Sequence, residues 1–100
     1  MRKIEQQMNE AVRAFQNVKT WESLSWSKGN TTVTRQPDGF IDVYLHGNHI
    51  AQIGERMLVS LPTLRRWPSM TTRSRLRALG ADLVSIKGVL HLNGKSIYAE

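Results

Sequence analysis

Short turn motifs recur along this chain, and their spacing constrains the fold more than any other feature. Glycine accepts positive φ at little steric cost, and Pro, Asp and Asn favour the other turn positions. Such motifs stand at residues 28–30 (Lys-Gly-Asn), 36–39 (Gln-Pro-Asp-Gly), 47–48 (Gly-Asn), 54–55 (Gly-Glu), 87–88 (Lys-Gly) and 93–94 (Asn-Gly). The motifs fall into two blocks of the chain, one over residues 28–55 and one within residues 82–100. Within each block the stretches between turns are too short for ordinary helices, so the sequence predicts β-hairpins.

The first block predicts a hairpin of residues 31–35 and 41–45, joined by the turn at 36–39. Its second strand alternates in hydrophobicity, which is typical of a strand with one buried face. One face carries Ile41, Val43 and Leu45, and the other carries Phe40, Asp42, Tyr44 and His46. Residues 51–62 are expected to hold one or two further strands.

Two histidines flank a Gly-Asn pair at residues 46–49 and raise the question of a metal or catalytic site. Gly47-Asn48 is a two-residue loop signal of tight hairpins, and it would place His46 and His49 opposite each other. A stable metal site takes three or four protein ligands, and the sequence offers no third one nearby. No carboxylate lies beside them in the sequence either, which leaves general base catalysis unsupported. We therefore interpret both histidines as turn-flanking residues.

The second block, residues 82–100, predicts a three-stranded meander with turns at Lys87-Gly88 and Asn93-Gly94. The Asn-Gly pair is the strongest hairpin signal in the chain. The expected core residues of this meander are Ile86, Val89, Leu90 and Leu92.

Residues 2–18 predict an amphipathic helix, because apolar side chains recur at steps of three and four. The apolar positions are Ile4, Met8, Ala11, Val12, Phe15 and Val18. The opposite face mixes positive and negative charges, which favours a helix that covers a sheet over one that lies on a membrane. A helix that binds a partner or a second subunit is the remaining alternative.

Residues 71–80 predict a short Arg-rich helix, capped by Ser69 or Thr71 and ended at Gly80. Its core stripe is expected to be Thr72, Leu76 and Leu79. On a helical wheel Arg75 flanks this stripe on one side and Arg73 and Arg77 on the other, while the small residues that point away are Ser74 and Ala78. The preceding residues 63–70 are predicted to form a loop, because prolines interrupt the stretch.

Together these segments predict an α+β fold with an N-terminal helix, antiparallel hairpins or a meander, and one short Arg-rich helix between them. A length of 100 residues suits one domain spanning 1–100. The chain has no cysteine, which excludes thiol catalysis, disulfides and thiolate metal sites. We find no apolar run of membrane-spanning length and no secretory signal.

Arginine is distributed unevenly in a chain whose formal net charge is +6. Arg binds phosphate and carboxylate through planar, bidentate contacts, and no Asp or Glu occurs from Met57 to Ala81. Three interpretations stay open: a solvated surface, a nucleic-acid interface, or a docking face for an acidic host-protein surface. The candidate binding residues are Arg65, Arg66, Trp67, Arg73, Arg75 and Arg77, with Lys28 and Arg35 as helpers.

Sequence motifs of catalysis are missing. The chain has no phosphate-binding loop, nucleophile elbow or metalloprotease helix. Its acidic residues are scattered rather than paired for acid–base work. We therefore expect no enzyme activity, no cofactor and no metal, and we keep an enzyme only as a distant third alternative.

Several segments occur in an order that resembles a known protein family. They are MRKIEQQMNEAV at the start, NTTV and VYLHGNHIA in the middle, and a Trp followed by TTRSRLRALG. This order is similar to that of a family of small accessory proteins of short-tailed lytic bacteriophages (podophages). The similarity covers roughly two thirds of the chain and is weakest over the final meander.

The resemblance implies a small phage protein that acts by binding in the cytoplasm of an infected bacterium. It singles out motif positions of unassigned role: His46, Asn48, His49, Thr72 and Ser74. Our first hypothesis is a non-enzymatic, nucleic-acid-binding accessory protein. The alternative is an inhibitor that binds a host polymerase, nuclease or antiviral defence complex through the same basic face. Neither hypothesis involves a membrane, and both leave the oligomeric state open.

Overall fold

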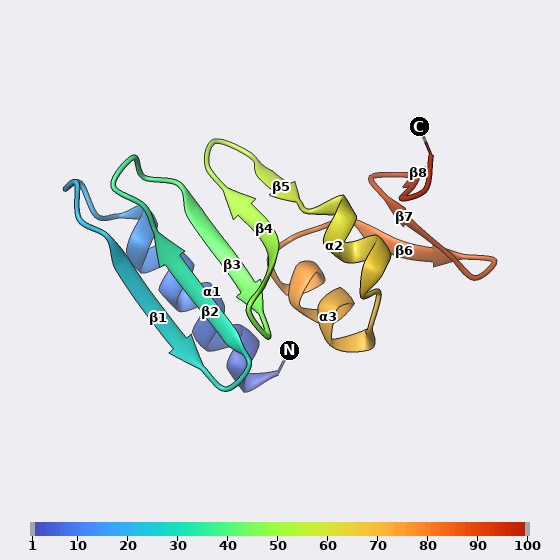
Figure 1. Ribbon diagram of the computed structural model, residues 1–100, viewed down its shortest axis with the longest axis horizontal. Coiled ribbons are helices and arrows are strands. Elements are labelled where there is room, and N and C mark those ends of the chain that lie inside the picture. Colours follow the sequence, from blue (N-terminus) through green and yellow to red (C-terminus); the bar gives the residue numbers. More distant parts are fainter. Residues whose placement is uncertain (1, 100) are drawn as a thin grey trace.

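The computed structural model describes residues 2–99, which form three helices and eight strands (Figure 1). In chain order the elements are α1 (Lys3–Gln16), β1 (Leu24–Lys28), β2 (Thr31–Arg35), β3 (Ile41–Leu45), β4 (Asn48–Ile53), β5 (Met57–Val59), α2 (Leu61–Arg66), α3 (Met70–Ala78), β6 (Leu83–Ile86), β7 (Val89–Leu92) and β8 (Lys95–Ser96). The strands form two antiparallel sheets, ordered β1-β2-β3-β4-β5 and β6-β7-β8. The predicted α+β fold with an N-terminal helix is confirmed.

The larger sheet is a meander in which each strand pairs with the next in sequence. β2 and β3 form the predicted hairpin, with Val33 opposite Val43. The predicted inner face of β3 is confirmed, since its buried apolar residues are Ile41, Val43 and Leu45. The alternation of apolar and polar residues therefore sets which side of this sheet faces the core.

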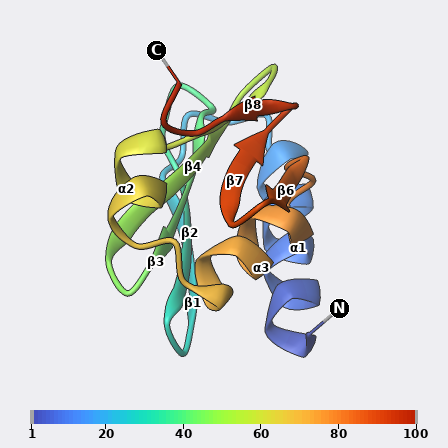
Figure 2. The same ribbon diagram turned by 90° about the vertical axis from the view of Figure 1, so that its right-hand side faces the viewer.

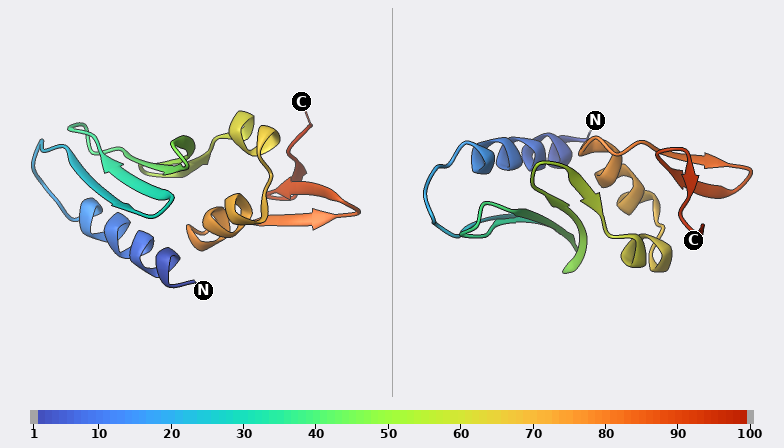
Figure 3. Two further views of the ribbon diagram at one scale, coloured as in Figure 1. Left: turned by 60° about the horizontal axis from the view of Figure 1, so that its bottom comes forward. Right: turned by 90° about the horizontal axis from the view of Figure 1, so that it is seen from above.

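α1 covers one face of the larger sheet, and the opposite face carries no other element of residues 2–99 (Figure 3). Met8 and Val12 of α1 are buried in the same core as Val33 and Val43. The predicted helix that covers a sheet is therefore present, although it ends at Gln16 rather than at Val18.

The sequence predicted a loop where the structure has α2. Pro62 lies in the first turn of this helix, where its missing N–H has no intrahelical acceptor to lose. The helix ends before Pro68, because Trp67 leaves the helical region with φ −131°. Ser69 caps α3 as predicted and accepts a backbone N–H at 3.2 Å, and Gly80 follows its end with φ +107°. α2 and α3 lie between the two sheets (Figures 1 and 3).

The C-terminal sheet has the predicted turns. Lys87, Gly88, Asn93 and Gly94 all take positive φ, which is the conformation that two-residue hairpin loops require. Figure 2 shows β7 nearer the viewer than α3, with β8 above both. Local turn chemistry therefore predicts this sheet well.

The predicted core of the C-terminal sheet is wrong in part. Ile86 and Val89 are 48% and 37% exposed. They pair with each other beside the β6–β7 turn, which projects away from the helices (Figure 1). The apolar residues of this region that do pack into the core are Leu83, Leu90, Leu92 and Ile97.

The β3–β4 turn is shifted from its predicted place. Leu45 pairs with Asn48, so the loop residues are His46 and Gly47, with φ +52° and +78°. His49 then lies opposite Tyr44 on β3, beside a β-bulge. The prediction that His46 and His49 face each other is therefore wrong, because the loop begins one residue earlier.

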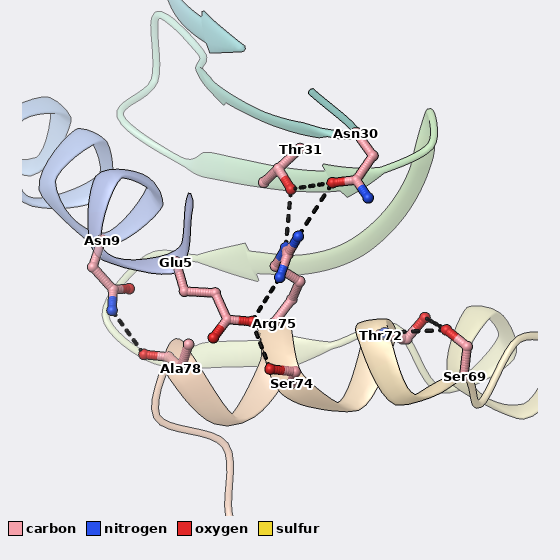
Figure 4. Close-up of polar contacts among 9 residues, drawn as sticks. All are labelled: Glu5, Asn9, Asn30, Thr31, Ser69, Thr72, Ser74, Arg75 and Ala78. Atoms are coloured by element: carbon pink, nitrogen blue, oxygen red, sulfur yellow. Dashed lines mark hydrogen bonds and ion pairs between the residues drawn. The ribbon is translucent and has the colours of Figure 1, made fainter. Parts of the chain in front are cut away.

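A buried ion pair joins α1, α3 and the start of β2 (Figure 4). Arg75 Nη1 lies 2.6 Å from Glu5 Oε2, and both side chains are 3% exposed. Arg75 also donates from Nε to Thr31 Oγ1 at 3.0 Å and from Nη2 to Asn30 Oδ1 at 3.2 Å. Ser74 Oγ donates to the same Glu5 oxygen at 2.6 Å. Each buried charge therefore has several partners, which offsets its desolvation.

The predicted outward face of α3 is also wrong in part, because this helix has a second neighbour. Ser74 contacts Glu5, and the carbonyl oxygen of Ala78 accepts a hydrogen bond from Asn9 Nδ2 at 3.0 Å (Figure 4). Ser74 and Ala78 therefore face α1 instead of pointing away. A helical wheel shows one apolar stripe but cannot show which polar side meets another helix.

Opposing effects set the pKa of Glu5. Burial raises it, while hydrogen bonds from Ser74 and Arg75 and the positive charge of Arg75 lower it. The backbone N–H contribution from Arg2 acts in the same downward direction, and the net pKa lies below the ordinary value of 4.5. The folded protein therefore holds Glu5 in its charged form.

We expect Arg75→Ala to lower the free energy of unfolding by about 3–5 kcal/mol, because it leaves the Glu5 carboxylate buried without a counter-charge. Urea unfolding measures this. The matched control is Arg56→Ala, since Arg56 is exposed and removing its charge should change stability by no more than about 0.5 kcal/mol. Equal losses in the two variants would show that the buried pair has no special role.

The ion pair also predicts the response to acid. Because the pKa of Glu5 is lower in the folded chain than in the unfolded chain, its contribution is complete above about pH 4.5 and is lost as the pH falls through the folded pKa. Glu5→Gln lacks this carboxyl and should be less stable than the wild type at neutral pH. Urea unfolding across an acid series should show the gap between the two narrowing on acidification, and a constant gap would refute the linkage.

The left-handed conformation of His46 predicts a permissive substitution. Asn adopts positive φ more readily than other residues with a side chain, so His46→Asn should keep or raise the melting temperature. Gly47→Val is the matched control and should destabilise by about 1–2 kcal/mol, because a β-branched residue is strained at φ +78°. Thermal unfolding compares them. A similar loss in both variants would mean that the imidazole itself holds the turn.

Candidate functional site

Two of the predicted binding arginines are structural. Arg75 is 3% exposed, and each of its three guanidinium nitrogens donates a hydrogen bond in the ion-pair network. Arg35 is 7% exposed and donates from Nη1 to the Glu22 carbonyl at 2.8 Å and from Nη2 to the Val18 carbonyl at 3.1 Å. The chain therefore uses these two side chains to satisfy buried polar groups, which disfavours them as contacts to a partner.

Arg65, Arg73 and Arg77 show a different pattern, in which Nε alone donates to a main-chain carbonyl. The acceptors are, in order, the carbonyl oxygens of Ile97 at 2.5 Å, Ser69 at 3.4 Å and Leu83 at 2.8 Å. Within residues 2–99 no hydrogen bond uses the terminal nitrogens of these three side chains. The terminal nitrogens can therefore make a bidentate contact to a phosphate or a carboxylate.

Arg73 and Arg77 line an open groove of about 520 Å³ between the start of α1 and α3. This basic groove is lined by Arg2, Glu5, Met70, Arg73, Ser74, Arg77 and Ala78. The Glu5 carboxylate already binds Arg75 and Ser74, so its charge is compensated inside the protein. The guanidinium groups of the groove therefore set its positive character.

A second groove, of about 540 Å³, lies between the β3–β4 turn and the α2–α3 connection. This Trp67 groove is lined by Leu45, His46, Asn48, Ile50, Thr63, Arg66, Trp67, Pro68, Ser69 and Thr72. Trp67 is 44% exposed, and Cζ of Arg66 lies 4.8 Å from the centre of its ring in a cation–π contact. The structure thus brings together Arg66 and Trp67 with the motif residues His46, Asn48 and Thr72.

Arg65 on α2 lines neither groove, and three further predicted site residues lie outside both grooves or do other work. Ser74 borders the basic groove but donates its hydroxyl to Glu5. His49 lies on the uncovered face of the larger sheet, where its Nε2 is 2.9 Å from Asp42 Oδ1. Lys28 is exposed at the end of the edge strand β1 and joins neither groove. These positions therefore do not form one surface with the arginines.

The sequence did not reveal Asp42 as the centre of a polar cluster. Asp42 is 3% exposed and accepts hydrogen bonds from Gln36, from His49 at 2.9 Å and from Gln52 at 3.2 Å. The alternation of β3 placed Asp42 beside Tyr44, but only the register of β4 shows that His49 reaches it. The Asp42 carboxylate therefore orients the imidazole ring of His49. Residues 2–99 hold no group of three or more His, Cys, Asp or Glu side chains that could bind a metal ion.

Comparison with known proteins relates the chain to a protein family. No helix within residues 2–99 has both the length and the apolarity to cross a membrane. No curated protein and no solved structure matches the chain. The family model described as Kyanoviridae Gp96 protein matches residues 1–99. This match supports the phage origin that the resemblance implied, and it does not indicate short-tailed phages in particular. The chain therefore belongs to the Kyanoviridae Gp96 family of phage proteins.

Proposed function

We propose that this phage protein is an accessory protein that binds nucleic acid through the basic groove and the neighbouring α2–α3 segment. The observation that carries the proposal is the state of Arg65, Arg73 and Arg77. Main-chain carbonyls hold their Nε atoms, while their terminal nitrogens have no partner among residues 2–99. An arginine held in this way loses less conformational freedom when it binds a phosphate.

The charge distribution supports a polyanionic partner. The formal net charge is +6, and the chain from Met57 to Ala81 contains no acidic residue. Glu5 is the acidic residue that lines the basic groove, and Arg75 compensates its charge. Each Lys or Arg that neutralises a phosphate releases counterions, which supplies most of the affinity of non-specific nucleic-acid binding.

The proposal is one of binding without catalysis, in the cytoplasm of the infected host. The Asp42–His49 pair, which has the chemistry of an oriented base, lines neither groove. The grooves themselves offer guanidinium, amide, hydroxyl and aromatic groups, which suit recognition.

One observation favours a second candidate, an inhibitor that binds an acidic surface of a host polymerase, nuclease or antiviral defence complex. Met70 is 71% exposed on the same helix as Arg73, and Trp67 is 44% exposed beside Arg66. Met, Trp and Arg are enriched in protein–protein interfaces. A carboxylate would occupy the same guanidinium groups as a phosphate.

We expect the double variant Arg73→Ala with Arg77→Ala to weaken binding to duplex and single-stranded DNA of any sequence by a similar factor. The plot of log affinity against log salt should become shallower by about two charges, because two phosphate contacts are lost. Fluorescence anisotropy with labelled oligonucleotides across a salt series measures both quantities.

The matched control removes two exposed charges elsewhere. Lys19 follows α1, and Lys87 lies in the β6–β7 turn, so Lys19→Ala with Lys87→Ala should leave the salt slope nearly unchanged. An equal effect of both double variants would show that binding reflects net charge alone. If neither variant binds worse than the wild type, the nucleic-acid proposal is wrong. Retention of one stoichiometric host protein by the wild type and not by Arg73→Ala with Arg77→Ala would then support the inhibitor.

A further inference from the structure

We propose that the Trp67 groove holds an unpaired nucleobase, so that the ligand of this protein is a single-stranded nucleic acid. This inference rests on the proposed function and adds to it a ligand class and a second site. The basic groove would contact the sugar–phosphate chain, and the Trp67 groove would take a base.

The shape and lining of the groove suit a base. Its volume of about 540 Å³ lies within the range of pockets that bind small organic groups. Trp67 presents a large aromatic surface that stays 44% exposed although the Arg66 guanidinium lies over the ring. Leu45 and Ile50 form an apolar floor of the groove, since both side chains are nearly fully buried. Stacking on an aromatic ring and an adjacent guanidinium is how proteins bind unpaired bases.

Unused polar groups border the same aromatic ring. Within residues 2–99 no hydrogen bond uses the side chain of His46 or Asn48, although both line the groove. His46 is held at the rim by its left-handed turn, and Asn48 begins β4. An amide and an imidazole offer donors and acceptors that match the exposed edge of a base. These groups therefore add hydrogen bonding to a stacking surface.

The two grooves border the same helix. Ser69 and Thr72 of the α3 region line the Trp67 groove, and Met70 and Arg73 line the basic groove. Residues three apart on a helix are neighbours on its surface, so Met70 and Arg73 lie next to each other on α3. Trp67 lies in the short connection that leads directly into this helix. A strand whose base enters the Trp67 groove can therefore run with its phosphates toward Arg73. Positive charge along this path complements the phosphate chain and favours it as the occupant over an uncharged ligand.

A duplex offers no free base to this groove. Its bases are stacked on both faces, and extracting one costs a few kcal/mol of stacking and pairing. The groove therefore predicts a preference for single strands that the arginines alone do not give, since phosphates are present in both forms.

The test compares probes that present unpaired bases with probes that do not. Fluorescence anisotropy would measure a single strand of about 16 nucleotides, made as DNA and as RNA, the matching DNA duplex, and a DNA strand of equal length with abasic sites. We expect the wild type to prefer a single strand with bases. Trp67→Ala should lose about ten- to a hundredfold affinity for that strand, with little change toward the abasic strand or the duplex. Its salt slope should stay the same, because no phosphate contact is removed.

Further variants separate stacking from folding. Trp21→Ala is the matched control, because Trp21 is 84% exposed and lines neither groove, and it should bind as the wild type does. Trp67→Phe keeps a ring and should recover most of the affinity. Asn48→Ala should weaken only the strands that carry bases. Thermal unfolding of each variant verifies that the fold is kept.

The outcomes separate this inference from the proposed function. Equal affinity of the wild type for the abasic and the complete strand, or unchanged binding by Trp67→Ala, would overturn the base site. The proposed function would survive that result as long as Arg73→Ala with Arg77→Ala still lowered affinity and salt slope. Absence of binding to every probe would overturn both.

Discussion

The buried pair of Glu5 and Arg75 is the contact on which the arrangement of the helices depends. It joins residues 70 apart in sequence and ties α1, α3 and the start of β2 together. Because successive residues of an α-helix are rotated by about 100°, a helix that buries position 75 turns positions 73 and 77 away from that contact. The burial of the Arg75 guanidinium therefore determines that the guanidinium groups of Arg73 and Arg77 remain outside the core.

The sequence predicts the strands well where turn chemistry is local. Gly88 and Gly94 each take positive φ within two-residue loops, and no distant contact is needed to explain them. The same local reasoning fails at α2, because Pro62 is as compatible with the first turn of a helix as with a loop. It also fails at Ile86, whose exposure depends on how far the β6–β7 turn projects from the helices.

The candidate site is less predictable than the fold, because its members differ only in distant partners. Arg75 and Arg77 are two residues apart on one helix, and on a helical wheel both flank its apolar stripe with the same charge. Arg75 meets Glu5, whereas Arg77 meets the carbonyl oxygen of Leu83 through Nε alone. The Trp67 groove likewise combines a hairpin turn with the connection between two helices, and no local pattern brings these segments together.

The main-chain contacts of Arg65 and Arg77 link the C-terminal sheet to the surface that we propose for binding. Nε of Arg77 donates to the carbonyl oxygen of Leu83, the first residue of β6. Nε of Arg65 donates to the carbonyl oxygen of Ile97, just after β8. A phosphate that binds the terminal nitrogens leaves these Nε contacts intact, since a guanidinium has separate donors for each. Docking of the sheet and binding of an anion are therefore compatible, and the packed sheet fixes the direction in which these arginines point. The exposed residues Ile86 and Val89 beside the β6–β7 turn do not share in this arrangement, because within residues 2–99 no guanidinium hydrogen bond reaches them.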